Sequence, residues 1–164
     1  ASVLCLALLV PHALATREFM ETYYGGTDCR GELRDWTARA LDPRWPYWEL
    51  AHPRRYSPFF EEARQGHSGV VRSRWLPDLM RQSSSLADLT QKIRQSGSNG
   101  ILIVLSERDY RLVLDLPQRM HDPGVRDCTY WPELVNALKA LGPTEYFHSS
   151  DGFLHAMAYE LPDR

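Results

Sequence analysis

The spacing of apolar residues changes near Gly97, and this change divides the chain into a mostly helical first part and a second part in which strands dominate. In the first part, apolar side chains recur three and four positions apart over 32–41 and 86–93, which predicts helices that bury one face. Ser85, with Asp88 three residues later, is typical of a helix start. Further short helices are expected over 16–24, 57–66 and 76–81, and a short strand over 70–75.

The second part is predicted to begin with a hairpin. Residues 101–105 are continuously apolar and largely β-branched, as expected of a central strand. Residues 110–116 alternate between apolar and polar positions, and residues 106–109 would form the connecting loop.

A second hairpin is predicted at the end of the chain. A helix over 132–141 separates it from the first hairpin. Residues 145–150 and 153–161 are expected to pair about Asp151-Gly152, the strongest short turn signal in the sequence.

This order of helices and hairpins predicts an α+β fold. We expect a mainly antiparallel sheet of about four strands, formed by the two hairpins of the C-terminal half, with the helices of the N-terminal half packed on it. Residues 42–57 hold several prolines among aromatic residues, so an ordered, packed loop is expected there.

The last hairpin brings two histidines within reach of each other. With Asp151-Gly152 as a two-residue turn, His148 lies opposite His155. Cross-strand partners have Cβ atoms about 4.5–5.5 Å apart, so the imidazoles could work as an acid–base pair or as two ligands of a zinc site. A third zinc ligand would have to come from the tertiary fold. If the loop has four residues, Tyr146 faces His155 instead, and the histidines are ordinary strand residues.

The aromatic segment near residue 47 is the candidate binding surface. Trp45, Tyr47 and Trp48 lie close to Arg55, and aromatic residues and arginine are over-represented at the hot spots of protein interfaces. The alternative is that these rings pack in the core beneath a long loop.

Residues 1–15 have the pattern of the end of a secretory signal peptide that is truncated at its start. An apolar run over 3–10 is followed by Ala13 and Ala15, the positions that a signal peptidase reads. The alternatives are a buried helix of the folded domain or a membrane anchor, although the run is shorter than the roughly 20 residues of a transmembrane helix. The expected organisation is a signal peptide over 1–15 and one α+β domain over 16–164, in a periplasmic or secreted protein.

Export would leave two cysteines for a disulfide. Cys5 would be removed with the signal peptide, so Cys29 and Cys128 would be the candidates for a pair in an oxidising compartment. The alternative is two buried, reduced thiols.

Charge and composition argue against several kinds of partner. A formal net charge of −2 provides no field that would hold a nucleic acid or an anionic membrane. The glycine clusters lack a nucleotide-binding pattern, and Ser68 lacks the second glycine of a nucleophile elbow. No cofactor, nucleic acid, nucleotide or stable transmembrane span is expected, and the expected partner is another protein.

One segment resembles a known family. Residues 98–105, followed by Arg108 and Arg111, are similar to the Asn-Gly, apolar strand and Arg segment of TPM domains, a family linked to exported or membrane-anchored phosphatase and assembly-factor roles. The resemblance is confined to this segment, so it implies neither the fold nor the metal site of that family.

These observations favour a small exported domain that binds another protein, as an inhibitor, an immunity-type protein or an accessory protein. A binding protein needs only shape and a few anchor residues, whereas a hydrolase of this size usually carries a recognisable nucleophile or metal-ligand spacing. Two alternatives stay open. One is an extracytoplasmic hydrolase that uses His148 and His155 as an acid–base or zinc site, and the other is a structural or assembly subunit of a membrane-associated complex.

Overall fold

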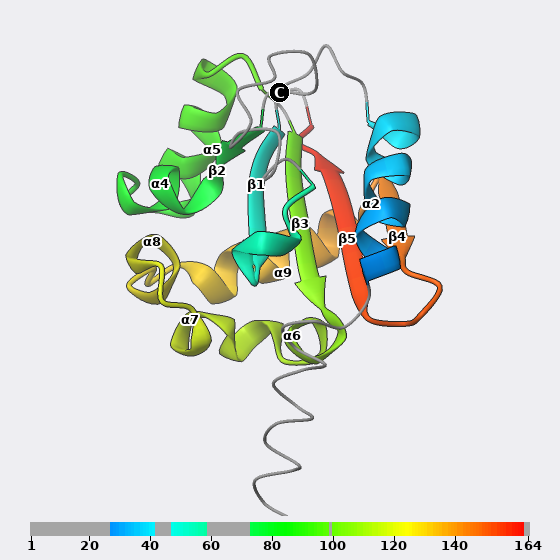
Figure 1. Ribbon diagram of the computed structural model, residues 1–164. Coiled ribbons are helices and arrows are strands. Elements are labelled where there is room, and N and C mark those ends of the chain that lie inside the picture. The colour runs from blue at the N-terminus through cyan, green and yellow to red at the C-terminus, as the bar shows by residue number, and fades with distance from the viewer. Residues whose placement is uncertain (1–26, 42–46, 59–72, 99, 163–164) are drawn as a thin grey trace, which may run out of the picture.

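The computed structural model describes residues 27–41, 47–58, 73–98 and 100–162 (Figure 1). The predicted signal peptide and the helix expected over 16–24 lie outside these residues, as does most of the helix expected over 57–66. In the described parts of the chain, no helix is long and apolar enough to cross a membrane.

The described strands form one mixed sheet in the order β2-β1-β3-β5-β4. The strands are β1 (Tyr47–His52), β2 (Ser73–Trp75), β3 (Gly100–Ser106), β4 (Glu145–His148) and β5 (Leu154–Glu160). Strand β1 pairs in parallel with both β2 and β3, whereas β5 pairs antiparallel with β3 and β4. The α+β fold is therefore confirmed, but the expected mainly antiparallel sheet is wrong because half of its pairings are parallel.

Strand β1 occupies the segment that was expected to be a packed loop. Tyr47 and Ala51 face one side of the sheet, and Trp48 and Leu50 face the other. A strand buried on both faces shows no alternation between apolar and polar positions, and Glu49, itself only 2% exposed, interrupts the apolar run. The period that identifies a half-buried strand is therefore missing from the sequence.

The expected first hairpin is wrong, because a helix follows β3. Residues that were assigned to its loop and second strand form α6 (Glu107–Arg111), η2 (Val113–Asp115) and α7 (Leu116–Arg119). The Ser106 hydroxyl accepts a hydrogen bond from the Asp109 N–H and so caps α6. The antiparallel neighbour of β3 is instead β5.

The other helices precede and follow β3 along the chain. They are α2 (Thr27–Ala40), η1 (Arg54–Tyr56), α4 (Leu76–Arg81), α5 (Leu86–Gln95), α8 (Pro123–Arg126) and α9 (Trp131–Leu141). The predictions of α4, α5 and α9 are confirmed, and Ser85 caps α5 as expected. Helices are not confined to the N-terminal half, since α6 to α9 all follow β3.

Two apolar clusters cover the two faces of the sheet. One joins Ile101 and Ile103 of β3 to residues of α4, α5 and α9, and the other joins Leu102 and Val104 of β3 to residues of α2. Figure 1 shows α2 and α9 on opposite sides of the sheet. The sheet therefore separates two apolar cores, one on its α9 face and one on its α2 face.

The expected disulfide between Cys29 and Cys128 is not present. Cys29 belongs to the cluster on the α2 face, whereas Cys128 packs against the cluster on the α9 face. A disulfide needs Cα atoms within about 7 Å, and the sheet lies between these two residues. The predicted pair is therefore wrong.

Candidate functional site

Polar side chains gather at the edge of the sheet where β1 and β3 end. Because these strands are parallel, His52 and Ser106 finish at the same edge, and α6 begins there. The turn between β4 and β5 also lies at this edge, next to α6 in the lower part of Figure 1. Ligands of open sheets with parallel strands bind outside the carboxyl ends of those strands.

His155 of β5 lies at the centre of these groups. Its Cα pairs with that of His148 across the hairpin, which confirms the predicted register. The two imidazole rings are stacked, with centroids 4.3 Å apart and planes at 21°. The Tyr110 ring from α6 stacks on the same imidazole at 4.1 Å. His155 is only 4% exposed, whereas His148 is exposed.

Both ring nitrogens of His155 are engaged. Its Nε2 contacts the Glu107 carboxylate, and its Nδ1 lies 2.5 Å from the Tyr146 hydroxyl oxygen. Hydrogen bonds from His155 and then Arg111 hold the pKa of Glu107 below its ordinary value. An ionised carboxylate only accepts hydrogen bonds, so in the neutral imidazole Nε2 carries the proton and Nδ1 accepts from Tyr146.

Tyr146 reaches His155 although the two are not directly paired. The Cα partner of Tyr146 is Met157, so the phenol crosses diagonally to the histidine two residues away. The register is therefore that of the histidine pair, and Tyr146 contacts the same imidazole as a diagonal neighbour. Desolvation, together with the nearby Tyr110 and Glu107, raises the pKa of Tyr146 and keeps the phenol protonated.

A second network lies beside the first and is built on Asp109. Its carboxylate accepts hydrogen bonds from His52 Nδ1 at 2.9 Å, from the Ser106 hydroxyl at 2.7 Å and from Arg119 at 3.1 Å. Burial raises the pKa of Asp109, but the hydrogen bonds from His52 and Ser106, with the charges of His52 and Arg119, outweigh it and leave the pKa low. The single short helix α6 thus supplies a carboxylate to each of two histidines.

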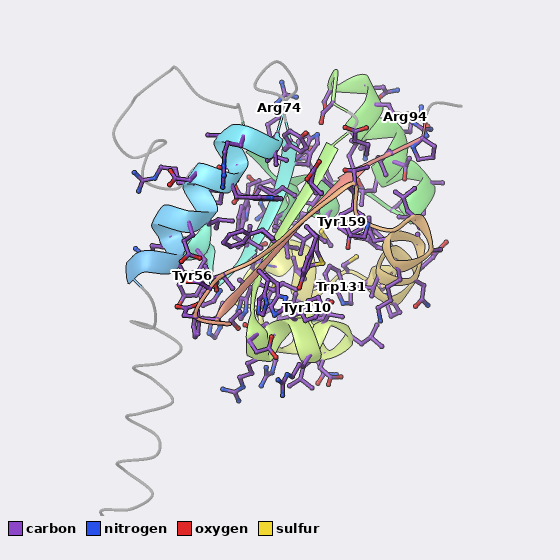
Figure 2. All side chains as sticks on the ribbon, turned by 90° about the vertical axis from the view of Figure 1, so that its right-hand side faces the viewer. Tyr56, Arg74, Arg94, Tyr110, Trp131 and Tyr159 are labelled. Atoms are coloured by element: carbon purple, nitrogen blue, oxygen red, sulfur yellow. The ribbon has the colours of Figure 1, made fainter. Side chains whose placement is uncertain are left out.

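A pocket of about 590 Å³ adjoins the His155 network. It lies among α6, η2, α9 and strands β3, β4 and β5, and its lining is mostly apolar. Tyr110, Trp131 and Tyr159 line it, and Figure 2 shows these side chains one below another along the sheet. Tyr146 also forms part of the wall, so its hydroxyl joins the pocket to the histidine.

The exposed large apolar residues of the described chain surround this pocket. They are 39–51% exposed, and we call them the apolar patch: Tyr110, Leu112, Leu114, Leu141 and Tyr146. All of them except Leu141 line the pocket, and Leu141 is the last residue of α9, two residues beyond the lining residue Lys139. Large exposed apolar patches often mark interaction sites.

Two of the four predicted binding residues, Tyr47 and Trp48, have described side chains, and both are buried. Tyr47 and Trp48 are 4% and 8% exposed and belong to the two cores, as the alternative of core packing expects. The Trp48 indole N–H donates to the Ser96 hydroxyl at 2.9 Å, which satisfies its polar atom inside the protein. Trp45 lies outside the described residues, and the side chain of Arg55 is not among those described.

The site contains residues that sequence reasoning missed. Glu107 and Tyr110 were assigned to a hairpin, and Tyr146 was considered only as an alternative partner of His155. The sequence does carry a signal for α6, because Ser106 followed by Asp109 matches the cap pattern that correctly predicted α5. Glu107, His148 and His155 also form a group whose ligand atoms could hold a metal ion.

The chain matches no known family model, no curated protein and no solved structure. The short resemblance to TPM domains therefore gains no support.

Proposed function

We propose that this protein binds another protein through the apolar patch and the pocket that it surrounds. The observation that carries the proposal is that the exposed large apolar side chains among the described residues gather at one place, around one pocket. That the binding occurs outside the cytoplasm is a proposal that rests on residues 1–15 alone.

The shape of the patch favours a protein over a small molecule. A ligand inside the pocket would cover the inner wall but not the outward sides of Leu112 and Leu114, which are 39% and 51% exposed. A protein partner could insert one large apolar side chain into the pocket and cover the surrounding leucines with its own surface. Interface hot spots have this arrangement, in which a ring of weaker contacts excludes water from a filled pocket.

The charged residues at the pocket provide its polar rim. Arg111 and Asp115 lie on the α6 and η2 side, and Lys139 lies on α9. Rim charges contribute to orientation and association rate more than to affinity. The expected partner surface is therefore an apolar side chain flanked by polar residues of both charges.

The proposal is tested by site-specific photo-crosslinking in cells that produce the protein. A photoreactive residue at Leu114 is expected to form one adduct of defined mass, whereas the same residue at the exposed Gln91 of α5 forms none. Leu112→Asp, combined with the photoreactive residue at position 114, is expected to remove the adduct. No adduct at position 114, or the same adducts from both positions, would overturn the proposal.

A second candidate function is hydrolysis, and the chain of hydrogen bonds from Glu107 through His155 to Tyr146 favours it. In such a reaction a water molecule attacks an ester carbonyl and gives its proton to the Tyr146 oxygen, while the phenol proton moves to His155 Nδ1. The tetrahedral intermediate then breaks its C–O bond to the alcohol, and the leaving alkoxide takes a proton from Tyr146 as His155 returns its own to the phenol. Glu107 stabilises the imidazolium that forms, and the pocket holds an apolar acyl group. Positioned acid–base groups of this kind contribute about 10²–10⁴-fold to rate.

This candidate is tested with nitrophenyl esters of increasing acyl length. The pocket predicts that kcat/KM rises with chain length, and Tyr146→Phe should lower kcat by at least about 100-fold while the protein stays folded. Rates no greater than those of free imidazole, or equal rates in the wild type and Tyr146→Phe, would exclude it. The crosslinking result is unaffected by this outcome, so the two proposals can fail separately.

A further inference from the structure

We propose that Glu107, His148 and His155 form a binding site for one divalent transition metal ion of the zinc type. Each residue offers one ligand atom, and these three atoms all lie within 4.8 Å of one another. This site goes beyond protein binding through the patch, and it does not depend on that function.

The types of ligand fit this class of metal. Two imidazole nitrogens and one carboxylate oxygen form a ligand set found in zinc enzymes, with metal–ligand distances of about 2.0–2.2 Å. Two ligand atoms on one tetrahedral ion therefore lie about 3.3 Å apart. The most widely separated ligand atoms must therefore approach by up to about 1.5 Å to reach this geometry.

Two of the three ligand residues, His148 and Glu107, have side chains that are free to move towards a bound ion. His148 is exposed, and the Glu107 side chain is 32% exposed, so both can shift without disturbing a core. His155 is buried and stacked on Tyr110, and it supplies the fixed point of the site. The paired strands fix the backbone positions of both histidines.

Tyr146 provides the supporting contact that metal-bound histidines usually have. A ligating imidazole commonly donates its other N–H to an outer group, which fixes the ring and its tautomer. Here the Tyr146 oxygen lies 2.5 Å from His155 Nδ1 and can accept that hydrogen bond. A metal on Nε2 would displace the proton that this nitrogen holds against Glu107, and the hydrogen bond between His155 and Tyr146 would reverse its direction.

The surroundings leave room for a further ligand. Three protein ligands on a tetrahedral ion leave one position open, as in catalytic rather than structural zinc sites. Arg111 contacts the other oxygen of Glu107 and opposes a cation, but its side chain is 74% exposed and its charge is screened by solvent. No other described lysine or arginine forms an ion pair with Glu107.

The proposal is tested by adding Co²⁺ and Zn²⁺ to the purified protein without reference to any activity. Co²⁺ is expected to produce the visible absorption bands of a four-coordinate ion at one equivalent, and Zn²⁺ to displace it. The variant is His148→Gln, which changes an exposed side chain and is expected to leave the fold intact. The matched control is His121→Gln, which changes an exposed histidine outside the group.

The expected results separate this site from ordinary surface binding. His148→Gln should weaken Zn²⁺ binding by more than about 100-fold, whereas Tyr146→Phe, which removes an outer partner, should weaken it by about 10–100-fold. His121→Gln should bind as the wild type does. Nitrogen NMR should report the His155 proton on Nε2 before Zn²⁺ is added and on Nδ1 afterwards. Equal binding by the wild type and His148→Gln, or no binding by the wild type, would overturn the proposal.

Discussion

His155 and Asp109 can be buried at the edge of the sheet because their polar side-chain atoms have partners there. His155 is stacked by two rings, and its nitrogens contact Glu107 and Tyr146. Asp109 is 4% exposed and accepts three hydrogen bonds from side chains. An unpartnered polar group buried to this degree would cost several kcal/mol, on the order of what a small domain can lose before it unfolds.

The charge of Asp109 is expected to stabilise the fold. Asp109→Asn should lower the free energy of unfolding by about 2–4 kcal/mol, because His52 and Arg119 lose their ionised partner in a buried setting. The measurement is urea unfolding at pH 7. The matched control is Asp127→Asn, which removes the 65% exposed partner of Arg126 and should change stability by no more than about 0.5 kcal/mol.

The same pair of variants has a predicted dependence on pH. The pKa of Asp109 in the folded protein lies below its ordinary 3.8, so the unfolded chain takes up the proton first as the pH falls. The stabilisation is therefore complete above about pH 5 and is lost as the pH falls through that ordinary value towards the lower folded pKa. The stability difference between wild type and Asp109→Asn should shrink below about pH 4, and a difference independent of pH would contradict the assignment.

The sequence predicts the histidine pair of the site but not the residues that α6 contributes to it. The register of a short hairpin follows from its turn, so the pairing of His148 with His155 could be predicted. Glu107 and Tyr110 reach the same imidazole from a helix that is distant in the sequence, and no local rule predicts such a contact. The sequence did not place Tyr47 and Trp48 in a buried strand, because the number of aromatic rings in a segment does not indicate whether it is a surface loop or a central strand.

At the level of elements, the β4–β5 turn determines the position of the site. Gly152 adopts a φ of +73°, and its N–H donates to the Ser149 carbonyl at 2.9 Å. The Ser150 backbone N–H and hydroxyl both donate hydrogen bonds to the Glu32 carboxylate of α2. These bonds attach the turn to the helix that covers the α2 face of the sheet. The turn thus sets both the register of the two histidines and the contact of the hairpin with α2.

Two glycine substitutions are expected to have opposite effects on stability. Gly152→Ala should destabilise the protein by about 1–2 kcal/mol, since a side chain disfavours the left-handed backbone at that residue. Gly31→Ala should stabilise it by about 0.5–1 kcal/mol, because Gly31 lies inside α2 and no described atom lies within 4 Å of the added methyl group. Thermal unfolding measures both. Equal effects of the same sign would show that backbone conformation does not determine how these two substitutions change stability.

Elements with a complete local signal were predicted, and elements defined by their neighbours were not. Helices α5 and α9 carry an apolar stripe with a recognisable start, and the β4–β5 hairpin carries its turn. Both faces of strand β1 are covered, so its sequence does not alternate between apolar and polar residues. The pattern that would predict a strand is therefore absent from this segment. The parallel pairing of β1 with β3 depends on that strand, and the mixed sheet was missed for the same reason.

At the scale of the whole molecule, two cores on opposite faces of one sheet share a single polar edge. The α9 face carries the pocket and the apolar patch, and the edge carries both histidine–carboxylate pairs. Because Tyr146 belongs to the pocket wall and to the His155 network, a partner bound at the patch would lie directly against the proposed metal site. Binding and metal occupancy are therefore expected to influence each other.

The separation of the cysteines by the sheet provides a test of this arrangement. Peptide mapping after alkylation of the unfolded protein should find Cys29 and Cys128 modified to the same extent with and without prior reduction, since neither is in a disulfide. In the folded protein, Cys128 should react first. Cys29 is 1% exposed, and burial, followed by the nearby Asp151, raises the pKa of its thiol to about 11, so little thiolate forms at pH 8. A peptide containing both cysteines, detected only without reduction, would contradict their placement on opposite faces. Fast modification of Cys29 in the folded protein would contradict the packing of α2 on the sheet.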